Sequence, residues 1–237
     1  TIVDVDKDRG ALQLIVQVVG RTTAQMAELK AGDTILDVVG PLGEAIPIEK
    51  TDLPFVIVGG GVGIAPIFPK VKALHEIGNR VITIIGARSA DLLMLEDELR
   101  EISDELIVTT DDGSHGRKAL VTEPLAEVIK REGKVEEVIA VGPPIMMKFC
   151  SRVATELGAD VLVSLNPIMI DGTGMCGGCR VTVGEDVQFA CVDGPCFDGA
   201  KIDWDEMTTR LKAYEDEERV ARDHWCRMQA AETEGKR

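Results

Sequence analysis

The chain of 237 residues has no long apolar run: none approaches the roughly 18–20 residues that a helix needs to span a bilayer. It also lacks a basic start followed by an apolar stretch, the pattern of a signal peptide. Basic residues are too few to offset the acidic ones, with 26 Lys and Arg against 41 Asp and Glu and a net charge of −15. This balance disfavours contact with nucleic-acid phosphates. We therefore expect a cytoplasmic protein with no membrane or nucleic-acid partner.

Histidine is scarce, and its positions suggest no catalytic group. His75, His115 and His224 are scattered along the chain, and no Ser/His/Asp or Cys/His arrangement can be built on them. There are six cysteines, and three of them fall within sixteen positions among glycines. In a chain without export signals this pattern favours metal or cluster ligation over disulfides.

The sequence divides into three segments with different patterns. Residues 1–50 alternate apolar and polar positions in short runs, such as Ala11–Val19 and Thr34–Val39, which predicts part of a small antiparallel β-barrel. A short helix is expected at Thr22–Lys30. Because the chain opens in a strand-like stretch without a methionine, we expect a further segment to precede it.

Residues 51–165 alternate apolar strands with amphipathic helices, which predicts a mostly parallel sheet covered by helices on both faces. Ligands of such sheets bind at the carboxyl ends of the strands. Residues 166–237 begin with the cysteine-rich stretch and then predict one or two surface helices within Trp204–Ala231. The expected strands of the middle segment are 55–58, 81–85, 106–109, 138–141 and 160–165, and its expected helices are 64–77, 92–102, 124–131 and 145–157.

A glycine-rich loop, Gly59-Gly60-Gly61-Val62-Gly63, follows the first of these strands and precedes a helix. Glycines let a diphosphate approach the backbone, and the helix start offers free N–H groups. The spacing is not G-x-G-x-x-G, because Ile64 or Pro66 would take the third glycine position. A tight turn would explain one or two glycines, whereas four in five residues favour nucleotide binding.

Loops after the later strands supply further candidate contacts to the same nucleotide. Arg88 and Ser89 suit the 2′-phosphate of NADP, yet an arginine also stacks on adenine, so the choice between NAD and NADP stays open. The candidates in these loops are Gly86, Arg88, Asp111, Asp112, Gly142 and Pro143.

The cysteine-rich stretch carries the second constellation. Cys176 and Cys179 can point two thiolates at one metal, Cys191 follows twelve positions later, and the surrounding glycines free N–H groups for sulfur. Zinc is the alternative, but one C-x-x-C among so many glycines favours a loop wrapped around a cluster. The spacing leaves Asp171 and Cys196 as candidates for the fourth ligand.

These motifs together resemble the small, flavin-containing subunit of NADH-dependent ferredoxin:NADP oxidoreductase, also described as the sulfide dehydrogenase small subunit. More distantly they are similar to the electron-transfer subunit of type B dihydroorotate dehydrogenase. The resemblance covers nearly the whole chain. It rests on Val19–Thr23, Gly40–Gly43, Gly59–Pro66, Gly142–Lys148, Asp171–Cys179 and Phe189–Pro195.

The resemblance implies a ferredoxin reductase-like arrangement, with an FAD-binding barrel at 1–50, an NAD(P)-binding α/β domain at 51–165 and a [2Fe–2S] segment with C-terminal helices at 166–237. It also implies that Asp171 replaces the first cysteine of the dihydroorotate relatives, which makes Asp171, Cys176, Cys179 and Cys191 the ligands. Cys196 departs from that branch, which usually has glutamate there. The positions that match flavin-binding motifs are Thr1, Ile2, Gly20, Thr22 and Thr23.

The function implied by the resemblance is electron transfer. NADH over the Gly59–Gly63 loop would give hydride to the flavin, and single electrons would pass through the cluster to a larger flavin and iron–sulfur subunit in a heterodimer. Such an assembly permits flavin-based electron bifurcation and exchange with ferredoxin. The alternatives are a dihydroorotate dehydrogenase or sulfide/polysulfide reductase subunit and, from another class, a non-catalytic zinc-binding assembly subunit.

Overall fold

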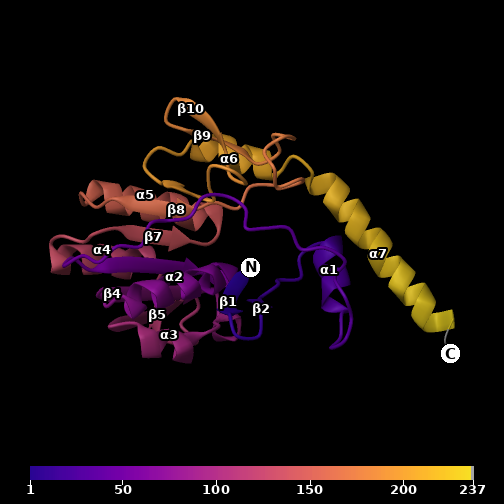
Figure 1. Cartoon of the computed structure of the whole chain (residues 1–237), viewed down its shortest axis with the longest axis horizontal. Helices are drawn as coiled ribbons and strands as arrows, with labels where there is room; N and C mark the ends of the chain where they lie inside the picture. The colour runs from indigo at the N-terminus through magenta and orange to yellow at the C-terminus, as the bar shows by residue number, and fades with distance from the viewer. Residues whose placement is uncertain (236–237) are drawn as a thin grey trace.

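The computed structural model describes residues 1–235 and is built around a seven-stranded sheet (Figure 1). The strand order is β11-β8-β7-β3-β4-β5-β6. All neighbours pair in parallel except the edge strand β11, which runs antiparallel to β8. The strands are β3 (Phe55–Gly60), β4 (Val81–Ala87), β5 (Glu105–Thr110), β6 (Arg117–Lys118), β7 (Val138–Val141), β8 (Val161–Ser164) and β11 (Cys196–Asp198).

Helices cover both faces of this sheet, as the sequence predicts. Along β3, Val56 and Val58 belong to the core under one face, and Ile57 belongs to the core under the other. Every residue of β3 and β4 is buried, which is expected of a parallel sheet covered on both sides. The helices are α2 (Ile64–Glu76) and α3 (Glu96–Ile102) on one side, and α4 (Thr122–Glu132) and α5 (Pro144–Glu156) on the other.

One of the expected helices is shorter than predicted. The stretch 92–102 was expected to be helical throughout, but a 3₁₀ turn occupies Ala90–Leu92 and α3 begins only at Glu96. Leu95 has a φ of 56°, the left-handed region, so it cannot continue a right-handed helix.

The N-terminal residues form fewer strands than the sequence predicts. β1 (Ile2–Asp6) and β2 (Ala11–Leu14) make an antiparallel pair, and α1 (Arg21–Ala27) is the expected short helix. The strand predicted to reach Val19 ends at Leu14, and 34–39 is not a strand. These stretches lack a neighbouring strand to pair with in the described structure, and Leu36 is left 93% exposed.

The C-terminal segment adds a hairpin and two helices. β9 (Arg180–Val183) and β10 (Asp186–Phe189) pair as a separate two-stranded sheet. α6 (Trp204–Leu211) packs against this hairpin, and α7 (Glu215–Gly235) extends away from the body, with α1 beside it (Figure 1). In the described part of the chain no helix is both long enough and apolar enough to cross a membrane.

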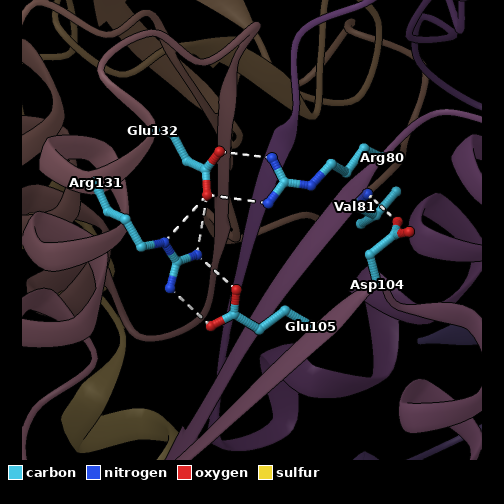
Figure 2. Close-up of polar contacts among 6 residues, drawn as sticks. All are labelled: Arg80, Val81, Asp104, Glu105, Arg131 and Glu132. Atoms are coloured by element: carbon cyan, nitrogen blue, oxygen red, sulfur yellow. Dashed lines mark hydrogen bonds and ion pairs between the residues drawn. The ribbon is translucent and has the colours of Figure 1, made fainter.

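A polar network joins elements at the amino-terminal edge of the sheet (Figure 2). Glu132, at the end of α4, accepts hydrogen bonds from Arg80 at 2.6 and 3.1 Å and from the neighbouring Arg131 at 3.1 Å. Arg131 also donates to Glu105 at the start of β5. Asp104 accepts the Val81 N–H at 2.7 Å. The network therefore ties α4 to β4 and β5 at the edge opposite the nucleotide loop.

Candidate functional site

The β9–β10 hairpin explains how two cysteines twelve positions apart meet. Cys179 directly precedes β9 and Cys191 lies two residues after β10, and the pairing of Arg180 with Phe189 brings these two ends together. Ala190 N–H donates to the Cys179 carbonyl at 3.2 Å. The two Sγ atoms consequently lie 3.2 Å apart, and both side chains are buried.

A tight turn places the other two predicted ligands beside each other. The Asp171 carboxylate accepts the backbone N–H groups of Thr173 at 2.9 Å and Cys176 at 3.0 Å. The Cys176 sulfur accepts the Gly178 N–H at 3.4 Å. Gly172 and Gly174, with φ of 78° and 83°, adopt a backbone that L side chains rarely take, which is why the turn is rich in glycine. Asp171 and Cys176 are both exposed.

The electrostatics of the turn differ between its open and its buried side. Backbone N–H donation from Thr173, followed by contacts from Cys176, holds the pKa of Asp171 below its usual value, so the residue is a carboxylate at neutral pH. Burial, together with the neighbouring Cys179 and the Asp171 charge, raises the pKa of the Cys191 thiol, whereas the Gly174 N–H opposes this. The negative charge of Asp171 thus contributes to the raised pKa of Cys191.

The donor set suits a two-iron cluster. Within residues 1–235, the structure gathers no three His, Cys, Asp or Glu side chains in a metal-binding arrangement, so it does not bring the four predicted ligands together as one set. It places them two by two: the Cys179 and Cys191 sulfurs lie 3.2 Å apart, and the Cys176 backbone N–H donates to the Asp171 carboxylate at 3.0 Å. A [2Fe–2S] cluster takes two protein ligands on each iron, and N–H groups directed at sulfur are typical of its sites. Three soft thiolates and one hard carboxylate fit this group.

Cys196, the competing fourth ligand, belongs to a different element. It lies in β11, opposite Ser164 of β8, and is partly buried. It lines a groove of about 280 Å³ together with Glu44, Phe55 and Ile139. Cys196 is thus part of the edge strand of the sheet, whereas the Asp171 carboxylate accepts the backbone N–H of Cys176 within the cysteine-rich turn. Of the remaining cysteines, Cys150 is fully buried in α5 and Cys226 is exposed on α7.

The glycine-rich loop has the predicted strand–loop–helix setting, but its glycines have different roles. The end of β3 contains Gly59 and Gly60, a 3₁₀ turn spans Gly61–Gly63, and α2 follows. A β-carbon at Gly59 would lie 2.6 Å from Ile67 Cδ1, and one at Gly63 would overlap the Val141 carbonyl. Only Gly61 of the four, with a φ of 54°, faces open space. Gly61 and Val62, both partly buried, are therefore the most open part of the loop.

The other predicted nucleotide contacts gather at the same carboxyl edge. Asp111 N–H donates to the Ala87 carbonyl at 3.0 Å, and Asp112 N–H donates to that of Arg88 at 3.2 Å, so the loops after β4 and β5 lie side by side. Packing against Met146 of α5 places Gly142 next to Gly60, and Pro143 caps α5. Gly86, within β4, is buried against Thr109 and is a packing residue.

Asp112 already has partners within its own turn. Its carboxylate accepts the N–H of Ser114 at 2.9 Å and the hydroxyl at 2.6 Å, and these bonds lower the pKa of Asp112. An adjacent groove of about 390 Å³, which no sequence motif predicts, is lined by Glu96, His115 and Met94 among others. The one feature of the sequence that could have indicated this groove is that its lining residues follow β4 and β5. His115 Nε2 lies 2.9 Å from the Glu96 carboxylate.

The predicted flavin-binding positions lie on two elements. Thr1 and Ile2 begin the β1–β2 pair, where Thr1 exchanges hydrogen bonds with Ile15. Gly20 precedes α1, and the Thr23 hydroxyl accepts the N–H groups of Val19 and Gly20 at 3.0 Å each. Thr23 therefore caps α1, and Thr22 is exposed.

Family models match two parts of the chain. The iron–sulfur cluster binding domain of dihydroorotate dehydrogenase B matches residues 166–203. The oxidoreductase NAD-binding domain matches residues 57–152. The first range contains the two donor pairs, and the second begins within β3 and contains the glycine-rich loop.

Curated relatives match over most of the chain. A Thermotoga maritima protein described as a dihydroorotate dehydrogenase B (NAD(+)), electron transfer subunit homolog is 50% identical over 234 residues, which are 99% of this chain and 82% of the relative. The Streptococcus pneumoniae electron transfer subunit of dihydroorotate dehydrogenase B is 34% identical over 202 residues, 83% of this chain and 78% of the relative.

A solved structure shares the fold. It is described as "Insights into flavin-based electron bifurcation via the NADH-dependent reduced ferredoxin-NADP oxidoreductase structure". Its TM-score is 0.86 at 50% identity, over 95% of this chain and 81% of the solved one. The comparisons confirm the ferredoxin reductase-like fold class and the oxidoreductase class, and they support FAD, an iron–sulfur cluster and NAD(H) as cofactors. The chain belongs to the family of dihydroorotate dehydrogenase B-type electron-transfer subunits.

Proposed function

We propose that this chain is the electron-transfer subunit of an NADH-dependent ferredoxin:NADP oxidoreductase, which works with a larger flavin and iron–sulfur subunit. The observation that carries the proposal is the meeting of Cys179 with Cys191 beside the Asp171–Cys176 turn. When bound, FAD exchanges a hydride with NAD(H) and the cluster relays single electrons. The residues of this chain bind and orient these groups, and no protein acid or base is required.

On the nucleotide side, we assign Gly61 and Val62 to the diphosphate, because they are the most open part of the loop before α2. We assign Arg88 and Asp111 to the far end of the nucleotide. Their loops follow β4 and β5 at the same edge of the sheet. The remaining predicted residues support these contacts indirectly, by packing closely behind the loops. They are Gly59, Gly60, Gly63, Gly86, Gly142 and Pro143.

On the cluster side, we assign Cys179 and Cys191 to one iron and Asp171 and Cys176 to the other. The buried pair lies on the protein side, and the exposed pair faces outward. An Asp in place of a Cys exchanges a soft ligand for a hard one of equal charge, which changes the electronic environment of that iron. We assign the flavin to residues 1–50, where Thr1, Ile2, Gly20, Thr22 and Thr23 lie.

The surroundings of the cluster loop support docking of the larger subunit there. Met175 is 88% exposed and Ile170 64%, and Val192 is also exposed. Val192 lies after β10 but packs against Gly174 of the turn, and exposed apolar side chains grouped in this way are typical of a protein–protein contact. None of the six cysteines forms a disulfide, which is typical of proteins of the reducing cytoplasm, so we include a cytoplasmic location in the proposal.

The first test is the visible and EPR spectrum of the anaerobically purified complex, with iron and flavin quantified. We expect Asp171→Ala to lose most of the cluster signal, because one iron loses its carboxylate ligand. Asp171→Cys should keep a cluster with altered g-values. Cys196→Ala is the matched control and should keep the wild-type spectrum. Cluster loss in Cys196→Ala with retention in Asp171→Ala would overturn the ligand assignment.

A second candidate is the electron-transfer subunit of a dihydroorotate dehydrogenase, favoured by the description of several relatives. Co-purification with a partner that oxidises dihydroorotate would establish it. A colourless protein that contains zinc and no iron would instead support the zinc-binding assembly subunit and refute an electron-transfer role.

A further inference from the structure

We propose that Leu42, Gly43 and Glu44 form a clasp that positions the cluster loop, so that this clasp sets the environment of the iron held by Asp171. The inference rests on the proposed function, because it assumes that the cluster is bound by Asp171 and the three cysteines. None of the three clasp residues is a ligand. They belong to the N-terminal segment, more than a hundred positions before the loop that they contact.

The first contact of the clasp is with the residue after Asp171. A β-carbon at Gly172 would lie 2.9 Å from Leu42 Cδ1, so the Leu42 side chain lies directly on the Gly172 backbone. Gly172 is buried although its neighbours Asp171 and Thr173 are exposed. Leu42 therefore covers the turn whose N–H groups orient the Asp171 carboxylate.

The second contact is with the other end of the cluster segment, three residues after Cys191. The Glu44 N–H donates to the Gly194 carbonyl at 2.6 Å. Gly43, with a φ of 76°, packs so closely that a β-carbon there would overlap the same carbonyl oxygen. The clasp thus touches the cluster segment at both ends, beside the first ligand and shortly after the last.

The strap that continues from the clasp is anchored at its far end, which prevents the clasp from drifting. Asn79, only 4% exposed, donates from its side-chain amide to the Glu49 carbonyl at 2.9 Å and accepts the Thr51 N–H at 2.9 Å. The Lys50 ammonium also donates to the Gly78 carbonyl. A segment held at both ends can transmit a fixed position to the loop that it touches.

Substitutions in the clasp should alter the properties of the cluster while the chain stays folded. In Leu42→Ala, water reaches the Gly172 turn, and water favours the more negatively charged, reduced cluster. We expect the midpoint potential to rise, the EPR line shape to change and iron release to a chelator to become several-fold faster. Gly43→Ala should act in the same direction by displacing the Gly194 carbonyl. Leu42→Met, which keeps the volume, should restore wild-type behaviour.

Two variants of the same N-terminal segment serve as controls. Leu36→Ala removes an equal side chain that is 93% exposed. Gly32→Ala places a methyl group on a backbone with a φ of 99° in open space, so it reproduces the backbone strain of Gly43→Ala without a clash. Neither control should alter the EPR spectrum, the potential or the rate of iron release. Circular dichroism and flavin content verify that each variant is folded.

A measurement on the unmodified complex covers the case in which Leu42→Ala fails to fold. Because coupling between sites is reciprocal, removal of the iron should speed hydrogen exchange at the Glu44 amide and leave residues 30–36 unchanged. The clasp is refuted, while the proposed function stands, if two results are found together. The clasp variants and the controls would have the same EPR spectrum, midpoint potential and rate of iron release, and the hydrogen-exchange rate of the Glu44 amide would be the same with and without iron. Wild-type protein without iron would refute both.

Discussion

At the scale of single residues, the structure separates glycines that pack from the glycine that faces a ligand. Gly59 and Gly63 have no room for a methyl group because α2 and the end of β7 lie against them. Gly61 has room but a positive φ. The same residue type therefore serves two purposes in one loop, close packing and an open approach to the backbone.

The two kinds of glycine predict different effects of substitution. Gly63→Ala should lower the free energy of unfolding by about 1–3 kcal/mol, since its β-carbon meets backbone atoms. Gly61→Ala should cost about 1–2 kcal/mol of backbone strain and also raise the Kd for NADH, because the methyl group stands on the open face. Gly133→Ala, with a φ of 73° and open space, is the control for strain. Chemical denaturation and NADH titration measure both effects; an unchanged Kd in Gly61→Ala would contradict the assignment.

At the scale of elements, side-chain hydrogen bonds join α4 to β4 and β5 at the amino-terminal ends of these strands. Glu132 at the end of α4 is the central acceptor for Arg80 and Arg131 (Figure 2). Its side chain is 13% exposed, whereas both arginines are 49% exposed. The hydrogen bond from Arg80 is the main reason that the pKa of Glu132 lies below its usual value, and burial opposes it.

The lowered pKa predicts the pH range in which this network stabilises the fold. A carboxyl group with a depressed folded-state pKa contributes stability above its unfolded pKa of about 4.5 and loses it as the pH falls through the folded pKa. Glu132→Gln should therefore be less stable than wild type by about 0.5–1 kcal/mol at pH 7 and equal to it near the acid limit. Urea denaturation across pH measures this. Glu156→Gln, in an exposed pair with Arg152, should change little at any pH.

At the scale of the whole molecule, the cluster segment is joined to the nucleotide-binding sheet through an edge strand. β11 pairs with β8, and acidic residues from both parts meet there. Burial raises the pKa of Glu137 to about 7, with further contributions from Asp160, Glu136 and Asp198. Lys201 offsets part of this charge through its 2.9 Å contact with Asp198. The junction thus carries a titration near neutral pH.

The raised pKa of Glu137 predicts a loss of stability at alkaline pH. A carboxyl group with a raised folded-state pKa stabilises the fold fully below its unfolded pKa of about 4.5, and that contribution is lost as the pH rises through about 7. At pH 8, Glu137→Gln should have a free energy of unfolding higher than that of wild type by about 1–2 kcal/mol after solvent screening, and therefore a higher melting temperature. Near pH 4 the two proteins should be equally stable. Calorimetry across pH measures the difference. Glu98→Gln, exposed on α3, should show no such crossover.

The sequence by itself determined most of the α/β core, because hydrophobic periodicity and glycine placement are local signals. The strands at 55–58 and 138–141 and the helices after them lie where they were predicted. The spacing of Cys176, Cys179 and Cys191 also predicted that these three cysteines are cluster ligands. The resemblance to a known family, rather than spacing, selected Asp171 over Cys196.

Only the tertiary structure decided which distant residues meet. The strand at Cys196–Asp198 forms because β8 offers an unpaired edge, and Thr34–Val39 stays irregular because no neighbouring strand is present in the described residues. The contacts of Leu42 with Gly172 and of Glu44 with Gly194 join segments far apart in the chain, so no local pattern reveals them. Periodicity reports which face of an element is buried; the partner that buries it is chosen by the packing of the whole chain.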